Sequence, residues 1–223
     1  VRRREGVGSN VRRLAADRRS NGAGIRKVGG WIVGRKHAAE VTGSRLVDGM
    51  MDFLLSDGPR MVETRRELDF YVVPMVNPDG VVAGNYRDNA QGTNLNRVWD
   101  TADAVNSPEV LAVVDATEDW LWNGGKMVFF ADVHSSSGAY SHYAYYASPG
   151  VEPPRYPHPE DYPADSLAFL KLIAENSADF HPTRGSTSSL DTNLARQYYM
   201  QATGALAFTF EGGYTYPNFG PLN

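Results

Sequence analysis

The feature that most constrains the fold is an alternation, between residues 28 and 211, of short apolar runs with stretches of helical periodicity. The apolar runs have the length and composition of buried strands: 28–33, 68–76, 127–133, 141–147 and 205–210. The periodic stretches predict helices: 43–55, 108–122, 163–180 and 193–202. Strands that alternate with helices are typical of an α/β fold with a largely parallel sheet. With no internal repeat and no linker, residues 28–223 are expected to form one such domain.

Turn and cap residues support these boundaries. Ser107 as N-cap, Pro108 in the first turn and Glu109 are residue types that favour the N-terminus of a helix. The tetrapeptide NPDG at 77–80 predicts a turn after the second strand. Residues 149–163 contain six prolines, which predicts a surface loop.

Composition and charge exclude several kinds of site and partner. The chain has no cysteine, which excludes a cysteine nucleophile, a thiolate zinc site and an iron–sulfur centre. The chain has 22 basic and 26 acidic residues. Residues 1–27 contain nine basic and two acidic residues, which leaves 13 basic and 24 acidic residues in 28–223. We expect residues 1–27 to be a disordered basic segment; a nucleic-acid arm is the alternative. The acidic body argues against nucleic acid as a partner, because phosphate binding needs a basic face. No apolar run approaches the ~20 residues of a membrane-spanning helix, so no membrane partner is expected.

Metal-binding or basic side chains follow three of the predicted strands. His37 and Glu40 lie just beyond the first strand, His134 follows the third, and Glu211 follows the last. The carboxyl ends of parallel strands meet at one edge of a sheet, where ligand-binding and catalytic residues of open α/β sheets gather. We therefore expect these four side chains to lie close together.

The residue types at this edge are those of a catalytic zinc site. Two histidines and one carboxylate are a known zinc ligand set, with the fourth position left to water or substrate. The i, i+3 spacing of His37 and Glu40 lets both side chains reach one point from a helical turn. Asp132, on the same strand face as His134, is a candidate partner for its ring. Taken singly, each residue has an ordinary alternative. His37 and Glu40 could be a solvated His beside a surface Glu, His134 a hydrogen-bonded His at a strand end, and Glu211 an exposed acid.

A polar, loop-rich stretch over residues 72–100 supplies further candidates. It contains Arg87, Asn96 and Arg97. An Arg guanidinium suits bidentate recognition of a carboxylate, and an Asn beside it adds a directional donor. Arg97 has the alternative of being part of a structural ion pair.

Six motifs occur in one order along the chain: His37-x-x-Glu40, Asn77-Pro78-Asp79-Gly80, Gly84-Asn85-Tyr86-Arg87, Asn94-Leu95-Asn96-Arg97-x-Trp99, Asp132-Val133-His134-Ser135 and Phe208-Thr209-Phe210-Glu211. In these motifs the chain resembles the zinc carboxypeptidase family, that of carboxypeptidases A and B, and most closely its cytosolic-carboxypeptidase-like branch. The resemblance implies a three-layer α/β/α fold with a central mixed, largely parallel twisted sheet. It also implies a zinc metallocarboxypeptidase with one Zn²⁺ per chain, acting on the C-terminus of a peptide or protein.

The resemblance also implies a role for each candidate residue. It implies three zinc ligands: His37, Glu40 and His134. Glu211 would be the general base and Arg87 would polarise the scissile carbonyl. Asn96 and Arg97 would hold the terminal carboxylate of the substrate, which makes cleavage exopeptidic.

The same branch resembles enzymes that trim terminal glutamates, so we expect a preference for an acidic C-terminal residue. Arg196 or Arg184 would supply the charge, because both fall in 183–202, where the family builds its side-chain pocket. The alternatives are that Arg196 lies on the outer face of its helix and Arg184 in a solvated loop.

The chain departs from the family pattern at several points. Asn94 stands where the family often has Asp as partner of the first zinc histidine, and a neutral amide raises ligand basicity less. The family's mobile substrate-side tyrosine has no assigned counterpart, because Tyr198 and Tyr199 lie in a helical pattern that indicates core packing. The chain is shorter than family members at both ends, so a truncated catalytic domain is expected.

Two alternative functions remain open at this point. One is a zinc amidohydrolase of the same fold that acts on cell-wall peptides or other non-protein amides. The other is a non-catalytic peptide-binding module, which the presence of both Glu40 and Glu211 disfavours. A serine hydrolase is disfavoured because no G-x-S-x-G motif occurs. The compartment is left open, with the cytoplasm favoured.

Overall fold

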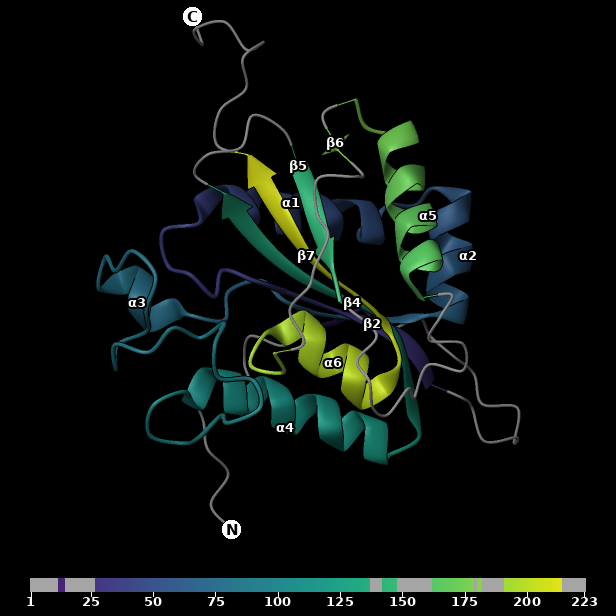
Figure 1. Ribbon diagram of the computed structural model, residues 1–223. Helices are drawn as coiled ribbons and strands as arrows, with labels where there is room; N and C mark the ends of the chain where they lie inside the picture. Colours follow the sequence, from purple (N-terminus) through teal and green to yellow (C-terminus); the bar gives the residue numbers. More distant parts are fainter. Residues whose placement is uncertain are drawn as a thin grey trace, which may run out of the picture.

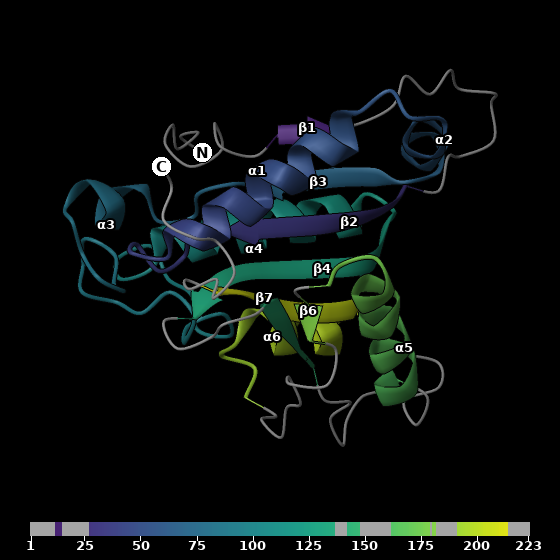
Figure 2. The ribbon, with the colours of Figure 1, turned by 90° about the horizontal axis from the view of Figure 1, so that it is seen from above.

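A computed structural model describes residues 12–14, 27–136, 142–147, 162–178, 180–181 and 191–213. The strands are β1 (Arg12–Leu14), β2 (Lys27–Gly34), β3 (Asp69–Val73), β4 (Gly125–Ser136), β5 (His142–Tyr146), β6 (Phe180–His181) and β7 (Leu206–Gly213). They form a seven-stranded sheet in the order β1-β3-β2-β4-β7-β5-β6, and Figure 2 shows its middle strands side by side. Neighbours from β3 to β7 pair in parallel, as do β5 and β6, whereas β1–β3 and β5–β7 are antiparallel. The sheet is mixed and largely parallel, as expected.

Helices cover both faces of this sheet. They are α1 (Val41–Leu55), α2 (Pro59–Glu67), α3 (Pro78–Val82), α4 (Pro108–Trp122), α5 (Tyr162–Glu175) and α6 (Ala195–Thr203). Helices α1, α2 and α5 lie over one face, and α4 and α6 over the other (Figure 1). The three-layer α/β/α arrangement is therefore confirmed.

Strand β2 contributes to a separate apolar core on each face. Trp31 and Val33 pack with the buried residues of α4 and α6, whereas Ile32 packs with those of α1, α2 and α5. This division follows from the strand itself, because successive side chains point to opposite faces of a sheet. Trp31 also stacks on Tyr71 of β3, with ring centroids 4.6 Å apart. Full burial of side chains of this size stabilises the fold by about 1.5–3 kcal/mol each, which fixes β2 between the two layers.

The helix predicted from Ser107 agrees with the structure at both ends. Ser107 occupies the N-cap position and Pro108 the first turn of α4. The Ser107 hydroxyl accepts a hydrogen bond from the Asp103 backbone N–H (3.0 Å) and does not cap the helix. What holds α4 in place is its buried face, which includes Val110 and Val113.

Three short elements differ from the predictions. Helix α2 was not expected, because Met61 is its only buried residue and it lacks an apolar stripe. The predicted turn at 77–80 instead opens helix α3, where Asn77 Oδ1 accepts from the Gly80 N–H (2.9 Å). Helix α5 ends at Glu175, and Phe180 belongs to β6.

Within segment 1–27, where disorder was expected, residues 12–14 form β1 and pair with β3, and Lys27 begins β2. The rest of that segment and residues 149–161 of the proline-rich stretch lie outside the described residues. No described helix is long and apolar enough to span a lipid bilayer.

Candidate active site

The predicted reactive residues lie where parallel strands end. His37 comes three residues after β2, and His134 lies near the end of β4. Glu211 of β7 is the register partner of His134, so the two residues are neighbours across adjacent strands. In Figure 1 the arrowheads of β4 and β7 lie together at this edge. The expected convergence is therefore present in the structure.

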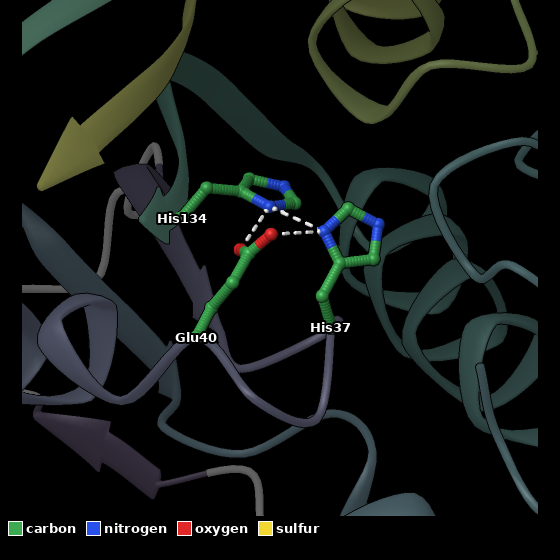
Figure 3. Close-up of side chains that lie close together, drawn as sticks. All are labelled: His37, Glu40 and His134. Carbon is green, nitrogen blue, oxygen red and sulfur yellow. Dashed lines mark hydrogen bonds and ion pairs between the residues drawn. The ribbon is translucent and has the colours of Figure 1, made fainter. Parts of the chain in front are cut away.

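His37, Glu40 and His134 form a compact cluster (Figure 3). His37 Nδ1 lies 2.6 Å from Glu40 Oε1, and His134 Nδ1 lies 2.7 Å from Glu40 Oε2. The two Nδ1 atoms are 3.1 Å apart. One ligand atom from each residue lies within 4.8 Å of the others, so together they can hold a metal ion.

The opposite ring nitrogens are held by acceptors. His37 Nε2 lies 3.1 Å from Asn94 Oδ1, which also accepts from the Asn96 backbone N–H (3.0 Å). His134 Nε2 lies 2.9 Å from Asp132 Oδ1. Because these oxygens only accept, each Nε2 can donate to its acceptor, which leaves each Nδ1 facing Glu40 as the nitrogen that can bind a metal ion in place of a proton. This donor set fits Zn²⁺, which imidazole nitrogens and carboxylates bind at about 2.0–2.2 Å.

The electrostatics of the cluster also favour a cation. Burial alone would lower the pKa of His134, but the charges of Asp132 and Glu40 outweigh it and raise this pKa to about 9. Burial alone would raise the pKa of Glu40, but hydrogen bonds from both histidines lower it to about 2. Burial lowers the pKa of His37. A centre that draws a proton onto His134 at neutral pH draws a metal cation for the same electrostatic reason.

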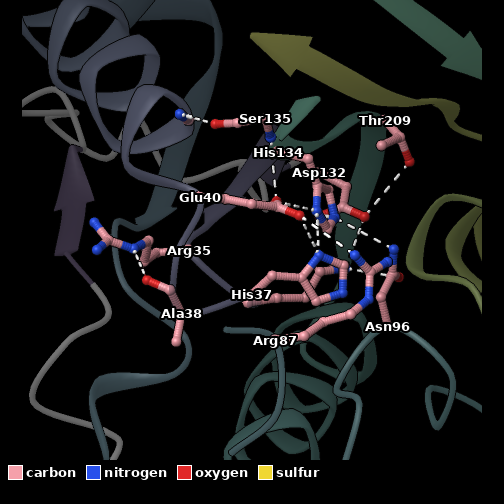
Figure 4. Close-up of polar contacts among 12 residues, drawn as sticks. Arg35, His37, Ala38, Glu40, Arg87, Asn96, Asp132, His134, Ser135 and Thr209 are labelled. Carbon is pink, nitrogen blue, oxygen red and sulfur yellow. Dashed lines mark hydrogen bonds and ion pairs between the residues drawn. The ribbon is translucent and has the colours of Figure 1, made fainter. Parts of the chain in front are cut away.

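Backbone contacts fix the carboxylate of this cluster. The Ser135 backbone N–H donates to Glu40 Oε2 (3.1 Å), and the Ser135 hydroxyl accepts from the Gly43 N–H (2.5 Å) (Figure 4). A Cβ on Gly43 would lie 2.9 Å from the His134 carbonyl oxygen. Glycine at this position therefore allows the first turn of α1, and Glu40 with it, to approach the end of β4.

Three further predicted site residues line the same open cleft of about 360 Å³: Arg87, predicted to polarise the scissile carbonyl, and Asn96 and Arg97, predicted to bind the substrate carboxylate. Arg87 is 40% exposed, and its Nη1 lies 3.8 Å from Glu40 Oε1. Asn96 is buried, and its Oδ1 accepts from Lys36 Nζ at 2.9 Å. Arg97 is exposed, and its Nη1 donates to the Asn96 carbonyl oxygen at 2.7 Å. The structure therefore brings one fixed amide and two accessible guanidinium groups beside the cluster.

Glu211 also lines this cleft. Burial raises the pKa of Glu211 to about 7, with smaller upward contributions from Glu40 and Asp132 and opposing ones from His134 and Arg87. A carboxylate with a pKa near neutrality is suited to accept and return a proton.

Arg196 also lines the cleft. Its side chain is largely buried, Nη1 donates to Thr209 Oγ1 (3.2 Å), and the guanidinium carbon lies 5.5 Å from the Tyr145 ring centroid. The alternative that Arg196 faces outward from its helix is therefore wrong. Arg184 lies outside the described residues.

Two kinds of residue at this site were not predicted from the sequence. Lys36 is fully buried beside the cluster; its only signal in the sequence was a charge between a buried strand and His37. Tyr143 and Tyr145 of β5 line the cleft, because antiparallel pairing places β5 beside β7.

Tyr198 and Tyr199 have structural contacts, as their helical pattern predicted. Tyr199 is buried, and its hydroxyl lies 2.9 Å from Thr117 Oγ1 of α4. The Tyr198 hydroxyl donates to Glu118 Oε1 (3.2 Å). Both tyrosines are thus tied to α4.

The chain is similar to known carboxypeptidases in sequence. A family model described as zinc carboxypeptidase matches residues 8–216. Cytosolic carboxypeptidase 6 of Mus musculus is 32% identical over 158 residues, which are 70% of this chain and 28% of the mouse protein. Cytosolic carboxypeptidase-like protein 5 of Bos taurus is 33% identical over 153 residues, 68% of this chain and 16% of the bovine protein. The chain thus spans less than a third of these relatives.

Solved structures show the same likeness. A metallo-carboxypeptidase from Burkholderia cenocepacia superimposes with a TM-score of 0.78 at 29% identity, over 92% of this chain and 52% of that one. A metallo-carboxypeptidase from Pseudomonas aeruginosa, solved in complex with (2-guanidinoethylmercapto)succinic acid, gives 0.68 at 25% identity, over 91% and 51%. The chain corresponds to about half of each of these structures.

Proposed function

Because the chain belongs to the zinc carboxypeptidase family, we propose that it is a zinc-dependent metallocarboxypeptidase that hydrolyses the C-terminal peptide bond of peptides or protein tails. The observation that carries this proposal is the shared cleft. It contains a metal-ligand set, a carboxylate with a raised pKa, and groups that can bind a terminal carboxylate. Together these groups supply the parts that metal-dependent exopeptidase chemistry uses, and they come from distant parts of the chain.

His37, Glu40 and His134 would hold the zinc ion, which when bound lowers the pKa of a coordinated water and polarises a carbonyl group. Glu211, the register partner of His134, would accept a proton from the attacking water and return it to the leaving amine. In the metal-free protein burial raises the pKa of Glu211 to about 7, well above that of Glu40, which makes Glu211 the more basic of these two carboxylates.

The arginines and Asn96 would bind and orient the substrate. Arg87 is held only at 3.8 Å from Glu40 and is partly exposed, so it can turn to the scissile carbonyl and stabilise the charge that develops on its oxygen. Asn96 and Arg97 would bind the terminal carboxylate. The Pseudomonas aeruginosa relative binds a succinic acid derivative, a compound with two carboxyl groups, which supports carboxylate recognition in this cleft.

The names of the sequence relatives also favour a cytosolic location.

The test of this function is a comparison of matched peptides with a free or an amidated C-terminus. We expect the zinc-loaded protein to remove residues one at a time from the C-terminus of the free peptide. It should leave the amidated peptide intact, because Asn96 and Arg97 require a carboxylate. Mass spectrometry of the products measures this. Cleavage of cell-wall peptides in place of protein tails would favour the amidohydrolase, and tight peptide binding without cleavage would favour the binding module.

We further propose that the enzyme prefers an acidic C-terminal residue and that Arg196 supplies the charge. A buried guanidinium paired with a carboxylate forms charge-assisted hydrogen bonds worth roughly 1.5–3 kcal/mol. We therefore expect kcat/KM for a peptide ending in Glu to exceed that for Leu or Lys by about tenfold to a hundredfold. Arg196→Met should abolish this difference, and Arg196→Lys should retain part of it.

Two variants serve as comparisons for this prediction. Arg45→Ala removes an exposed cation of α1 outside the cleft and should leave the preference unchanged. Arg184→Ala tests the second candidate arginine. A wild-type preference for Leu or Lys would contradict the proposal, as would a preference for Glu that survives in Arg196→Met.

A further inference from the structure

Lys36 is a buried cation to which the proposed function gives no role. It stands between β2 and His37, and its side chain is 0% exposed. A buried ammonium group is costly unless its donors are satisfied, so its partners define its contribution.

All sides of the Lys36 ammonium group are occupied by protein. Nζ donates to Asp132 Oδ2 at 2.7 Å and to Asn96 Oδ1 at 2.9 Å. Nζ also lies 4.7 Å from the centroid of the Trp99 ring, a cation–π contact. Two of the three ammonium donors are thus hydrogen-bonded, and the charge also faces the Trp99 ring. Lys36 is fully buried and does not line the cleft, so it is not a catalytic residue.

The contact with Asn96 determines which end of its amide faces the cleft. Asn96 Oδ1 accepts from Lys36 and from the Ala195 backbone N–H (3.3 Å). With its oxygen held on that side, Asn96 turns Nδ2 toward His134, whose Nε2 lies 3.3 Å away. The amide of Asn96, which lines the cleft, is thus oriented with Nδ2 beside His134 because Lys36 holds the acceptor.

The contact with Asp132 acts on the metal-binding cluster. Lys36 holds Oδ2 of this carboxylate, which leaves Oδ1 at 2.9 Å from His134 Nε2. Asp132 is itself fully buried, and Lys36 balances its charge. One cation therefore fixes the carboxylate that orients His134 and the amide that faces the substrate.

We propose that Lys36 is a positioning residue that sets the Asn96 amide and the Asp132 carboxylate together, and so aligns the carboxylate-binding side of the cleft with the metal-binding side. Its catalytic consequence rests on the proposed carboxypeptidase function. The contacts themselves are present whichever reaction the cleft carries out.

The first test separates positioning from charge balance. In Lys36→Met the side-chain volume is nearly kept, but Asn96 Oδ1 keeps only the Ala195 N–H as donor and Asp132 loses the cation on its Oδ2. We expect KM for a peptide with a free carboxylate to rise about tenfold, the effect of loosening one charge-assisted hydrogen bond, with a much smaller change in kcat. The double variant Lys36→Met/Asp132→Asn has no uncompensated buried charge, so it should recover thermal stability. Because Asn96 still lacks its partner there, its KM should stay high.

A cycle with Asn96→Ala tests the route of the effect. If Lys36 acts through Asn96, Lys36→Met should add no further increase in KM in the Asn96→Ala background. Met61 is the buried residue of α2 and lies outside the cleft. Met61→Ala is therefore a destabilised control, and its KM should equal the wild-type value.

A readout independent of activity uses the side-chain amide signal of Asn96 in NMR spectra, assigned with Asn96→Ala. We expect this signal to shift and broaden in Lys36→Met and in the double variant. An unchanged amide signal, or a KM restored to the wild-type value in the double variant, would overturn the proposal. If the wild-type protein cleaved no peptide, the proposed function would fail, while the NMR comparison would still test Lys36.

Discussion

We expect Glu211→Gln to lower kcat by about 10²–10⁴-fold, the range that a positioned general base contributes, while the protein keeps one zinc ion per chain. The amide has nearly the same shape as the carboxylate but cannot accept the proton of the attacking water. Glu211 lies across from His134 on the neighbouring strand but outside the ligand cluster, so its replacement should spare the metal. Steady-state kinetics and metal analysis of the same preparation measure both effects. A zinc-loaded, folded variant with near-normal kcat would rule out Glu211 as the base.

The same variant has an expected pH signature in the metal-free protein. Burial raises the pKa of Glu211 to about 7 in the folded state, against 4.5 for an ordinary Glu. The folded state therefore binds more protons than the unfolded state between these values, so ionised Glu211 costs stability as pH rises through this window. We expect Glu211→Gln to be more stable than wild type above pH 7, by at most roughly 3 kcal/mol, and equal below about pH 4.5. Glu63→Gln, on the exposed side of α2, is the matched control variant for this measurement.

We expect His134→Ala to lose both zinc and activity, since it removes one of the three groups that converge at the centre. The variant also leaves Asp132 without the ring that it orients, although Lys36 still balances its charge. Two remaining ligands do not complete a catalytic zinc site, which takes three protein ligands. Metal analysis after dialysis against a chelator should give one zinc per wild-type chain and close to none for the variant.

His181→Ala is the matched control for this measurement. His181 is exposed on β6 and lies outside the ligand cluster, so its removal should change neither the zinc content nor the turnover. Unchanged zinc content in His134→Ala would show that His134 is not a zinc ligand. His37 and Glu40 would then lack the third ligand that the proposed site requires.

Much of the site was predictable because the end of a predicted strand shows where in the sheet the next residues lie. A buried strand is visible as an apolar run, and in a parallel sheet its carboxyl end points to the edge where its neighbours also end. His134 and Glu211 could therefore be placed at one edge before any tertiary contact was known, and the structure pairs them in register. The His37-x-x-Glu40 spacing is local as well, so the sequence predicted that both side chains reach the same point.

Elements whose stability depends on distant contacts were not predictable in this way. Helix α2 buries only Met61, so its place comes from packing against the sheet and α1 rather than from its own periodicity. Tyr143 and Tyr145 reach the cleft because β5 pairs antiparallel with β7, a strand about sixty residues further along the chain. Neither the packing of α2 nor the pairing of β5 with β7 leaves a signal in the local sequence.

The sequence by itself thus determined the α/β class, five of the seven described strands and the reactive residues at strand ends, because these depend on periodicity and spacing. The tertiary structure alone decided that Arg196 faces the cleft and that Lys36 is a buried partner of Asn96 and Asp132. A charged residue in a sequence is indistinguishable from a solvated one until its surroundings are known. Only the packing of segments 60 to 100 residues apart takes water away from it and supplies the partners that make its burial possible.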